Sequence, residues 1–245
     1  MAHEVADRIY RLGAELVNWY VVEDGGRLTV VDAGNPRQYG QLPKVLAKLG
    51  RTMDDVDAIV LTHAHGDHIG SAARIKEVSG AAVHVHSSDV ALAHGEAPRE
   101  FERHYIRDMG HSFAWRSLLF FLREGALKPP PVHELAEFAH GEVLDVPGRP
   151  RVIHTPGHTA GSSCVEFTER KALMTGDALV TLSIVTGERN PRVMPGSFNN
   201  NSPEALESLN ELKGIGAEVL LPGHGEPWRG SVDAAVVLAQ QTGAN

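Results

Sequence analysis

The sequence predicts an α/β fold of two mixed β-sheets that pack face to face, with helices on their outer faces. Short apolar runs rich in β-branched residues occur in both halves of the 245-residue chain, and segments with helical character follow them. Several of these runs are followed by glycine, which is typical of buried strands that stop at a turn. The recurrence of strands and then helices in each half indicates two sheets rather than one.

The first half opens with a predicted β-hairpin. β-rich runs flank Asp24-Gly25-Gly26, a combination that favours a tight turn. The apolar run Ala58-Ile59-Val60-Leu61 predicts a buried strand that ends at Thr62. The other predicted strands are residues 16–23, 27–32 and 82–86, and the predicted helices are residues 37–49 and 69–78.

The second half alternates in the same way. Ser202-Pro203 predicts a helix start, because serine caps helix N-termini and proline fits the first turn. The predicted strands are residues 143–146, 151–155, 163–167, 171–175 and 218–221, and a terminal helix is expected at 232–241. Length and a hydrophobic content of 42% suit one domain, residues 1–245, with a helical insertion at about 87–131.

The predicted insertion is rich in aromatic side chains. Phe101 and Tyr105 stand four residues apart, and Arg99, Arg103 and Arg107 form another four-spaced row, as on two faces of a helix. We consider three roles: a lid that shapes an apolar pocket, half of a dimer interface, or an ordinary packed helix. A second loop-like stretch, residues 180–201, is a candidate substrate wall. Its Asn199, Asn200 and Asn201 are interpreted as turn formers.

Charge and composition exclude several classes of function. The formal net charge of −8 disfavours a nucleic-acid partner, which needs clustered Lys and Arg. We find no signal peptide and no apolar run near 18 residues, so we expect a cytoplasmic protein that acts on a small molecule away from membranes. The single cysteine, Cys164, excludes an intramolecular disulfide and is interpreted as a buried filler.

Metal-ligand residues crowd the loop after the strand that ends at Thr62. His63, His65, Asp67 and His68 fall within six consecutive residues, in Thr62-His63-Ala64-His65-Gly66-Asp67-His68. Imidazole and carboxylate together suit zinc, iron or manganese. The alternative is a polar loop in a chain that carries 14 histidines. Three further residues of ligand type each follow an apolar run and a glycine, so all seven are expected to meet at one edge of a sheet; they are His158, Asp177 and His224.

The ordered pattern resembles the metallo-β-lactamase superfamily of hydrolases. It consists of H-x-H-x-D-H, then Pro-Gly-His, Gly-Asp and a second Pro-Gly-His, over residues 58–225. The resemblance implies an αββα sandwich and two metals, zinc by expectation, with iron or manganese as alternatives. It implies one metal held by His63, His65 and His158, another held by Asp67, His68 and His224, and the Asp177 carboxylate bridging both.

Such a centre implies hydrolysis without a protein nucleophile. Two cations roughly 3.5–4 Å apart share a water, lower its pKa and generate a bridging hydroxide, while one cation polarises the carbonyl under attack. Asp67 is the expected catalytic residue, because a carboxylate beside that water can take its proton and return it to the leaving group. A role for Asp67 as a ligand alone is the alternative.

Departures from known subfamilies narrow the expected substrate to an ester, lactone or thioester of a small apolar acyl group. True β-lactamases mostly carry Cys or Ser where this chain has Asp177, which instead resembles the glyoxalase II and lactonase branches. The 21 residues after His224 leave no room for the glutathione-binding domain of glyoxalase II. Acyl-homoserine lactonases carry a tyrosine after their bridging Asp, whereas the last tyrosine here is Tyr105. Three alternatives stay open. The first is an iron-dependent redox enzyme similar to a persulfide dioxygenase, the second is a β-lactam hydrolase, and the third is a non-catalytic binding protein.

Overall fold

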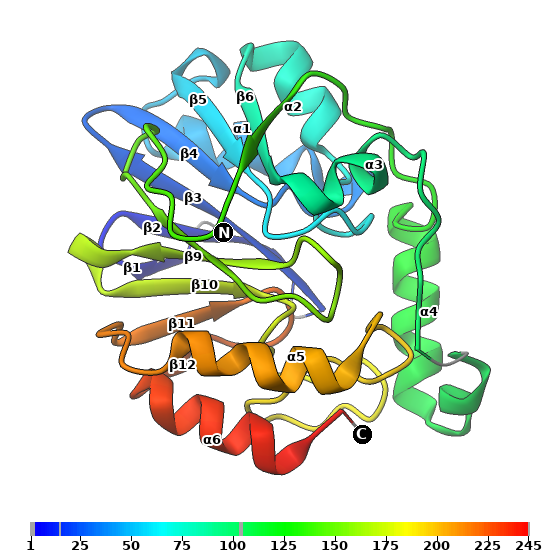
Figure 1. The fold of residues 1–245 in the computed structure, drawn as a ribbon. Coiled ribbons are helices and arrows are strands. Elements are labelled where there is room, and N and C mark those ends of the chain that lie inside the picture. The colour runs from blue at the N-terminus through cyan, green and yellow to red at the C-terminus, as the bar shows by residue number, and fades with distance from the viewer. Residues whose placement is uncertain (1–2, 15, 103–104, 245) are drawn as a thin grey trace.

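The computed structural model describes residues 3–14, 16–102 and 105–244, and two mixed β-sheets dominate it (Figure 1). The first sheet has seven strands in the order of the chain, with antiparallel pairing from β1 to β4 and parallel pairing from β4 to β7. Its strands are β1 His3–Ala6, β2 Ile9–Ala14, β3 Val17–Asp24, β4 Arg27–Val31, β5 Val56–Val60, β6 Ala82–His86 and β7 Leu135–Phe138.

The second sheet has five strands in the order β12-β11-β10-β9-β8, and its only parallel pair among the described residues is β10 with β11. Its strands are β8 Arg151–His154, β9 Ser163–Phe167, β10 Ala172–Gly176, β11 Val219–Pro222 and β12 Trp228–Arg229. The α-helices are α1 Gln41–Lys48, α2 Ala72–Ser79, α3 Val90–Ala93, α4 Ser112–Glu124, α5 Ser202–Ser208 and α6 Val232–Thr242. Short 3₁₀ helices cover Pro36–Gln38, Met53–Asp55, Ser87–Asp89, Tyr105–Gly110, Thr168–Arg170 and Leu209–Leu212.

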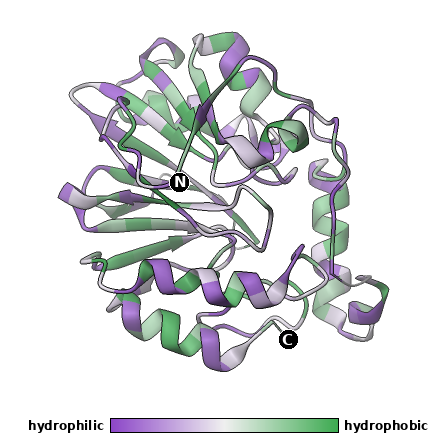
Figure 2. Cartoon of the chain, viewed as in Figure 1, coloured by the Kyte–Doolittle hydropathy of each residue, from purple (hydrophilic) through white to green (hydrophobic). Residues whose placement is uncertain are grey.

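The two sheets pack face to face because their strands alternate side chains between two apolar layers. In β5, Ala58 and Val60 join the core between the sheets, whereas Ile59 packs outward under α1 and α2. In β10, Met174 faces the other sheet and Leu173 packs under α5 and α6. Hydrophobic residues accordingly gather in the strands, while the outer helices mix both kinds (Figure 2). The predicted αββα sandwich is confirmed.

Most predicted elements are present with shifted ends. The hairpin at Asp24-Gly25-Gly26 joins β3 and β4 as expected. The expected helix at 37–49 breaks at Gly40 into a 3₁₀ turn and α1, and α2 begins at Ala72 rather than Ile69. Asn201, not Ser202, caps α5, because its side chain accepts from the backbone N–H of Glu204.

Four strands were missed and one predicted strand was wrong. β1, β2 and β7 extend the first sheet, and β12 extends the second. β7 is an edge strand with a single buried residue, Phe138. Residues 143–146 form only an isolated bridge from Val143 to Arg151. The apolar pattern there has another cause, since Leu144 and Val146 insert into the core between the sheets from irregular backbone.

The insertion lies at one side of the two sheets, where α4 runs along their edge (Figure 1). One face of α4 buries Ala114, Ser117 and Phe121. The opposite face leaves Leu119 and Trp115 exposed, at 63% and 52%. The predicted helical rows around Phe101 are wrong, because residues 99–101 have no helical structure; Arg103 and His104 lie outside the described residues. No helix in the described ranges has the length and apolarity to cross a membrane.

Two glycines let the strand ends of the two sheets approach closely. A Cβ on Gly176, which has a φ of +48°, would overlap the Thr62 hydroxyl after β5. A Cβ on Gly223, after β11, would overlap the Asp177 carboxylate. Both positions therefore require glycine for steric reasons.

Cys164 is buried in β9, and burial raises its pKa to about 12, which fits an unreactive filler.

A histidine stack joins the ends of two strands, one from each sheet. The rings of His86, at the end of β6, and His154, at the end of β8, lie parallel with centroids 4.0 Å apart. The backbone N–H of His154 donates to Nδ1 of His140 at 3.2 Å. Burial, then His154 and His140, lower the pKa of His86 from 6.5 to about 4.

This stack predicts a loss of stability in mild acid. Between pH 6.5 and about 4 the unfolded chain protonates His86 while the folded chain resists, so the free energy of unfolding falls as the pH falls through that window. His86→Phe should flatten part of this slope, measured by urea unfolding of chelator-treated protein at pH 7.5, 6 and 5. His3→Phe is the control, because His3 is an exposed residue of β1. Identical slopes for His86→Phe and the unaltered protein would refute the assignment.

Candidate metal centre

The seven predicted ligand residues lie together at the edge where strands of both sheets end. His63, His65, Asp67 and His68 belong to the loop after β5 of the first sheet, and the remaining three follow strands β8, β10 and β11 of the second. The sequence pattern predicted that they meet at one edge of a sheet. The structure corrects this prediction, since the cluster spans both sheets and depends on how they pack.

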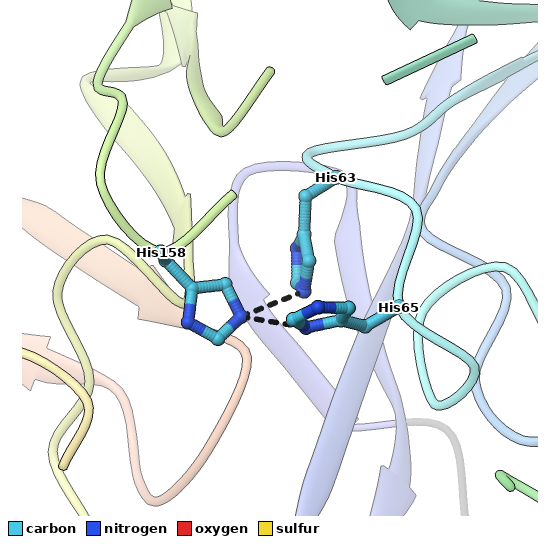
Figure 3. A group of neighbouring side chains, drawn as sticks. All are labelled: His63, His65 and His158. Atoms are coloured by element: carbon cyan, nitrogen blue, oxygen red, sulfur yellow. Dashed lines mark hydrogen bonds between the residues drawn. The ribbon is translucent and has the colours of Figure 1, made fainter. Parts of the chain in front are cut away.

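The first group consists of His63, His65 and His158. Nε2 of His158 lies 3.1 Å from Nε2 of His63 and 2.9 Å from Nδ1 of His65. Figure 3 shows the three rings pointing at one another, with His63 and His65 on one loop and His158 on another. Zinc bonds of 2.0–2.1 Å to tetrahedral nitrogens require ligand separations of about 3.3 Å. The three nitrogens thus have the spacing of one metal's ligands.

The second group consists of Asp67, His68 and His224. Oδ2 of Asp67 lies 3.6 Å from Nε2 of both histidines. Asp177 stands between the two groups: its Oδ1 is 3.3 Å from Nε2 of His68, and its Oδ2 is 3.0 Å from Nε2 of His224 and 3.4 Å from Nε2 of His158. The geometry therefore offers two sites for a cation with a shared carboxylate.

Buried polar atoms without a hydrogen-bond partner indicate whether these residues fit metal ions. Nε2 of His68 and Oδ1 of Asp177 are buried and have no hydrogen-bond partner among the described residues. Such atoms cost free energy unless something satisfies them. Both point into the cluster, so the residues fit cations. Asp67 is the most exposed of the seven, with 16% of its side chain accessible, and it borders the cavity above.

Hydrogen bonds behind the cluster hold the histidine rings. Nδ1 of His68 donates to Oδ2 of Asp32 at 2.8 Å. The Thr62 hydroxyl donates to the same carboxylate, at 2.9 Å from Oδ2, and lies 3.2 Å from Nδ1 of His63. Nδ1 of His224 donates to the carbonyl of Leu16. Because these contacts occupy Nδ1, each of the three rings turns Nε2 inward, as ligand-orienting contacts do in metal sites.

The pKa values of the side chains shift in different directions in the two groups of the cluster. Burial, with neighbouring imidazoles, lowers the pKa of His63 and His65 well below the usual range. Burial opposes charge on His68, but Asp177, Asp32 and Asp67 raise its pKa well above the usual range. Burial also opposes charge on Asp177, yet His224 and His68 hold the pKa of this carboxyl well below its usual range. The first group is neutral, and the second surrounds an anion.

Three residues that support the cluster were not predicted from the sequence. Asp32 directly follows β4, next to β5, and its position in the sheet could have indicated it. Asp89 joins the ligand loops, because its carboxylate accepts from the backbone N–H of Ala64 and Gly161 and from the Thr159 hydroxyl, at 2.7–3.0 Å. Asn199, interpreted as a turn former, places Oδ1 at 3.2 Å from Nδ1 of His158.

An apolar cavity of about 200 Å³ opens directly above the cluster. Its floor includes Asp67 and Asp177, and Arg99 is the only Lys or Arg among the described residues that line it. The Arg99 guanidinium donates to the carbonyl of Ala126 at 2.9 Å. The walls come from the insertion and from residues 180–201, as Phe101, Tyr105, Leu118, Phe121, Leu127, Ile184, Met194 and Phe198. The insertion and residues 180–201 therefore both line the cavity, and whether the insertion acts as a lid stays a prediction.

Comparisons with known proteins agree with the geometry. A profile described as Metallo-beta-lactamase superfamily matches residues 12–224. The probable metallo-hydrolase YflN of Bacillus subtilis is 26% identical, over 93% of this chain and 87% of that protein. The acyl-coenzyme A thioesterase MBLAC2 of Homo sapiens is 30% identical, over 90% and 76%.

A solved structure supports the same assignment. A metallo-beta-lactamase family protein of Thermus thermophilus superposes with a TM-score of 0.67 at 29% identity, over 96% of this chain and 79% of that one. The profile match, the two sheets and the cluster at their shared edge lead to one conclusion. This chain belongs to the metallo-β-lactamase superfamily of metal-dependent hydrolases.

Proposed function

We propose that this protein hydrolyses an ester, lactone or thioester of an apolar acyl group at a centre of two metal ions, with zinc the expected metal. The observation that carries the proposal is the convergence of seven ligand side chains, with unpaired buried atoms, on the floor of an apolar cavity. Similarity to the thioesterase MBLAC2 supports testing acyl thioesters first.

The ligand assignment follows the two groups. His63, His65 and His158 would hold one cation, Asp67, His68 and His224 the other, and Asp177 both. When bound, the cations supply Lewis-acid polarisation of a carbonyl and acidify water. The donor set of imidazole and carboxylate also accommodates iron or manganese, so the metal needs direct measurement.

The chain's own residues supply positioning and proton transfer. The apolar walls hold the acyl group and exclude bulk water from the carbonyl that lies above the cluster. Asp67, at the boundary between cluster and cavity, accepts a proton from the attacking water at its carboxylate. It then gives that proton to the leaving oxygen or sulfur as the carbonyl–oxygen or carbonyl–sulfur bond breaks, so that the product leaves as an alcohol or a thiol.

The proposal is tested by metal analysis of the purified protein together with a substrate panel. The panel contains acyl-coenzyme A thioesters of increasing chain length, aryl esters, lactones and a chromogenic β-lactam. We expect about two zinc ions per chain and turnover of at least one of the first three classes. Iron without hydrolysis of any substrate would instead favour the redox branch of the fold.

The bridging role of Asp177 predicts a joint loss of metal and activity. Asp177→Ala should lower metal content from about two ions per chain to one or fewer, because both cations lose their shared anion, and hydrolysis should fall with it. Elemental analysis and a hydrolysis assay measure the two effects, and circular dichroism checks the fold. Asp145→Ala, at an exposed carboxylate, is the control. Full metal content and activity in Asp177→Ala would contradict the shared centre.

Proton transfer by Asp67 predicts a slow but metal-loaded variant. Asp67→Asn keeps an oxygen ligand but cannot take a proton, so kcat should fall about 10²- to 10⁴-fold while metal content stays unchanged. A steady-state assay beside elemental analysis separates the two roles. A fall in rate that merely follows lost metal would identify Asp67 as a ligand alone.

The cavity walls predict a selective effect of a bulky substitution on α4. Leu118→Trp fills the cavity, so kcat/KM for an octanoyl thioester should fall about tenfold or more, because several buried methylenes lose their contacts. The acetyl thioester should change less than about twofold. The matched control is Leu119→Trp, since Leu119 is the exposed neighbour on the same helix. Equal losses on both substrates would place the acyl group elsewhere.

A further inference from the structure

Asn199 is a junction between three segments that are distant in sequence. The residue is fully buried in the loop that precedes α5. Its Oδ1 lies 3.2 Å from Nδ1 of His158, and its Nδ2 donates to the Met194 carbonyl at 2.7 Å and to the Ser202 hydroxyl at 3.1 Å. Its backbone carbonyl accepts from the N–H of Glu102 at 2.6 Å. All polar groups of the side chain are thus engaged.

These contacts fix which way the amide and the imidazole face. The Met194 carbonyl can only accept, so the amide nitrogen of Asn199 must face it, and Oδ1 must face His158. Nδ1 of His158 therefore carries the proton. Nε2, with its lone pair, is left to point at the ligand nitrogens of His63 and His65.

The same residue reaches the walls of the acyl cavity. Met194, whose carbonyl Asn199 contacts, and Phe198, which directly precedes Asn199, line the cavity, and so does Phe101, next to Glu102 in the insertion. The backbone N–H of Asn200 also donates to the carbonyl of His158 at 3.1 Å. A shift of either wall therefore acts on the position of His158 through Asn199.

We propose that Asn199 is a positioning residue that sets the tautomer and orientation of His158 and couples this ligand to both walls of the acyl cavity. The proposal rests on the proposed function, because it takes His158 as a metal ligand. Only an amide meets the requirement: aspartate keeps the acceptor for His158 but loses both donors, and leucine of similar size loses all three contacts.

Two variants and one control separate the two parts of this role, the orientation of His158 and its coupling to the cavity walls. Asn199→Leu removes every side-chain contact, whereas Asn199→Asp keeps the acceptor for His158 and loses the donor to the Met194 carbonyl. Asn201→Ala is the matched control in the same loop, because it removes the cap of α5 and leaves the contacts of Asn199 in place. Each protein is loaded with zinc, and zinc release to excess EDTA, thermal midpoint, kcat and KM are measured.

Asn199→Leu should release zinc about tenfold faster or more, as for lost ligand-orienting contacts, and Asn201→Ala should stay within about twofold of the unaltered protein. Asn199→Asp should retain zinc nearly as well as the unaltered protein, but its KM for an octanoyl thioester should rise more than for an acetyl thioester. Equal zinc release by Asn199→Leu and Asn201→Ala would overturn the proposal, since loop destabilisation would then explain both.

A spectroscopic measurement keeps this test distinct from the test of hydrolysis. In zinc-loaded protein, long-range ¹H–¹⁵N spectra should show an Nδ1–H signal of His158 that is protected from exchange. His158→Gln assigns this signal by removing it. In Asn199→Leu the signal should be lost to exchange with water. Failure of every substrate would refute the proposed function and leave this resonance in place. A His158 ring without the Nδ1–H, or unchanged protection in Asn199→Leu, would refute the role of Asn199.

Discussion

The structure depends on one costly arrangement, the burial of the Asp177 carboxylate between two sets of imidazoles at the meeting edge of two sheets. Only 3% of this side chain is accessible, and its oxygens lie 3.0–3.4 Å from nitrogens of His68, His158 and His224. An isolated buried anion would be strongly unfavourable, so the carboxylate requires positive charge beside it. The histidines, and by our proposal two cations, meet that requirement. The glycines at 176 and 223 leave the space in which the strand ends can bring these groups together.

The surrounding polar network makes the cluster rigid from both sheets. Asp32, at the end of β4, holds His68 directly and faces His63 through the Thr62 hydroxyl, so one carboxylate orients a ligand of each group. Asp89 fastens the loop of His65 to the loop of His158. Such contacts keep ligands in place before a metal or substrate arrives, which is the condition for efficient catalysis by a fixed site. The cavity walls join this network at Asn199.

The sequence indicated the seven-residue cluster and the sandwich because both leave local patterns, namely ligand residues after glycine and alternating apolar runs. It failed where structure depends on distant partners. β7 has one buried residue and is a strand only because β6 pairs with it. Leu144 and Val146 resemble a strand but insert into the core without one. Asn199 was interpreted as a turn former because its partners, His158 and Glu102, are 41 and 97 residues away. The supporting role of Asp32 could have been predicted from the sequence, because β4 and β5 were both predicted.

The central claim is that the cluster holds two cations that share Asp177, and anomalous diffraction from crystals of the zinc-loaded protein tests it most directly. We predict two zinc peaks about 3.5–4 Å apart, one among His63, His65 and His158 and one among Asp67, His68 and His224, with Asp177 between them. A single peak, or peaks outside these groups, would contradict the account.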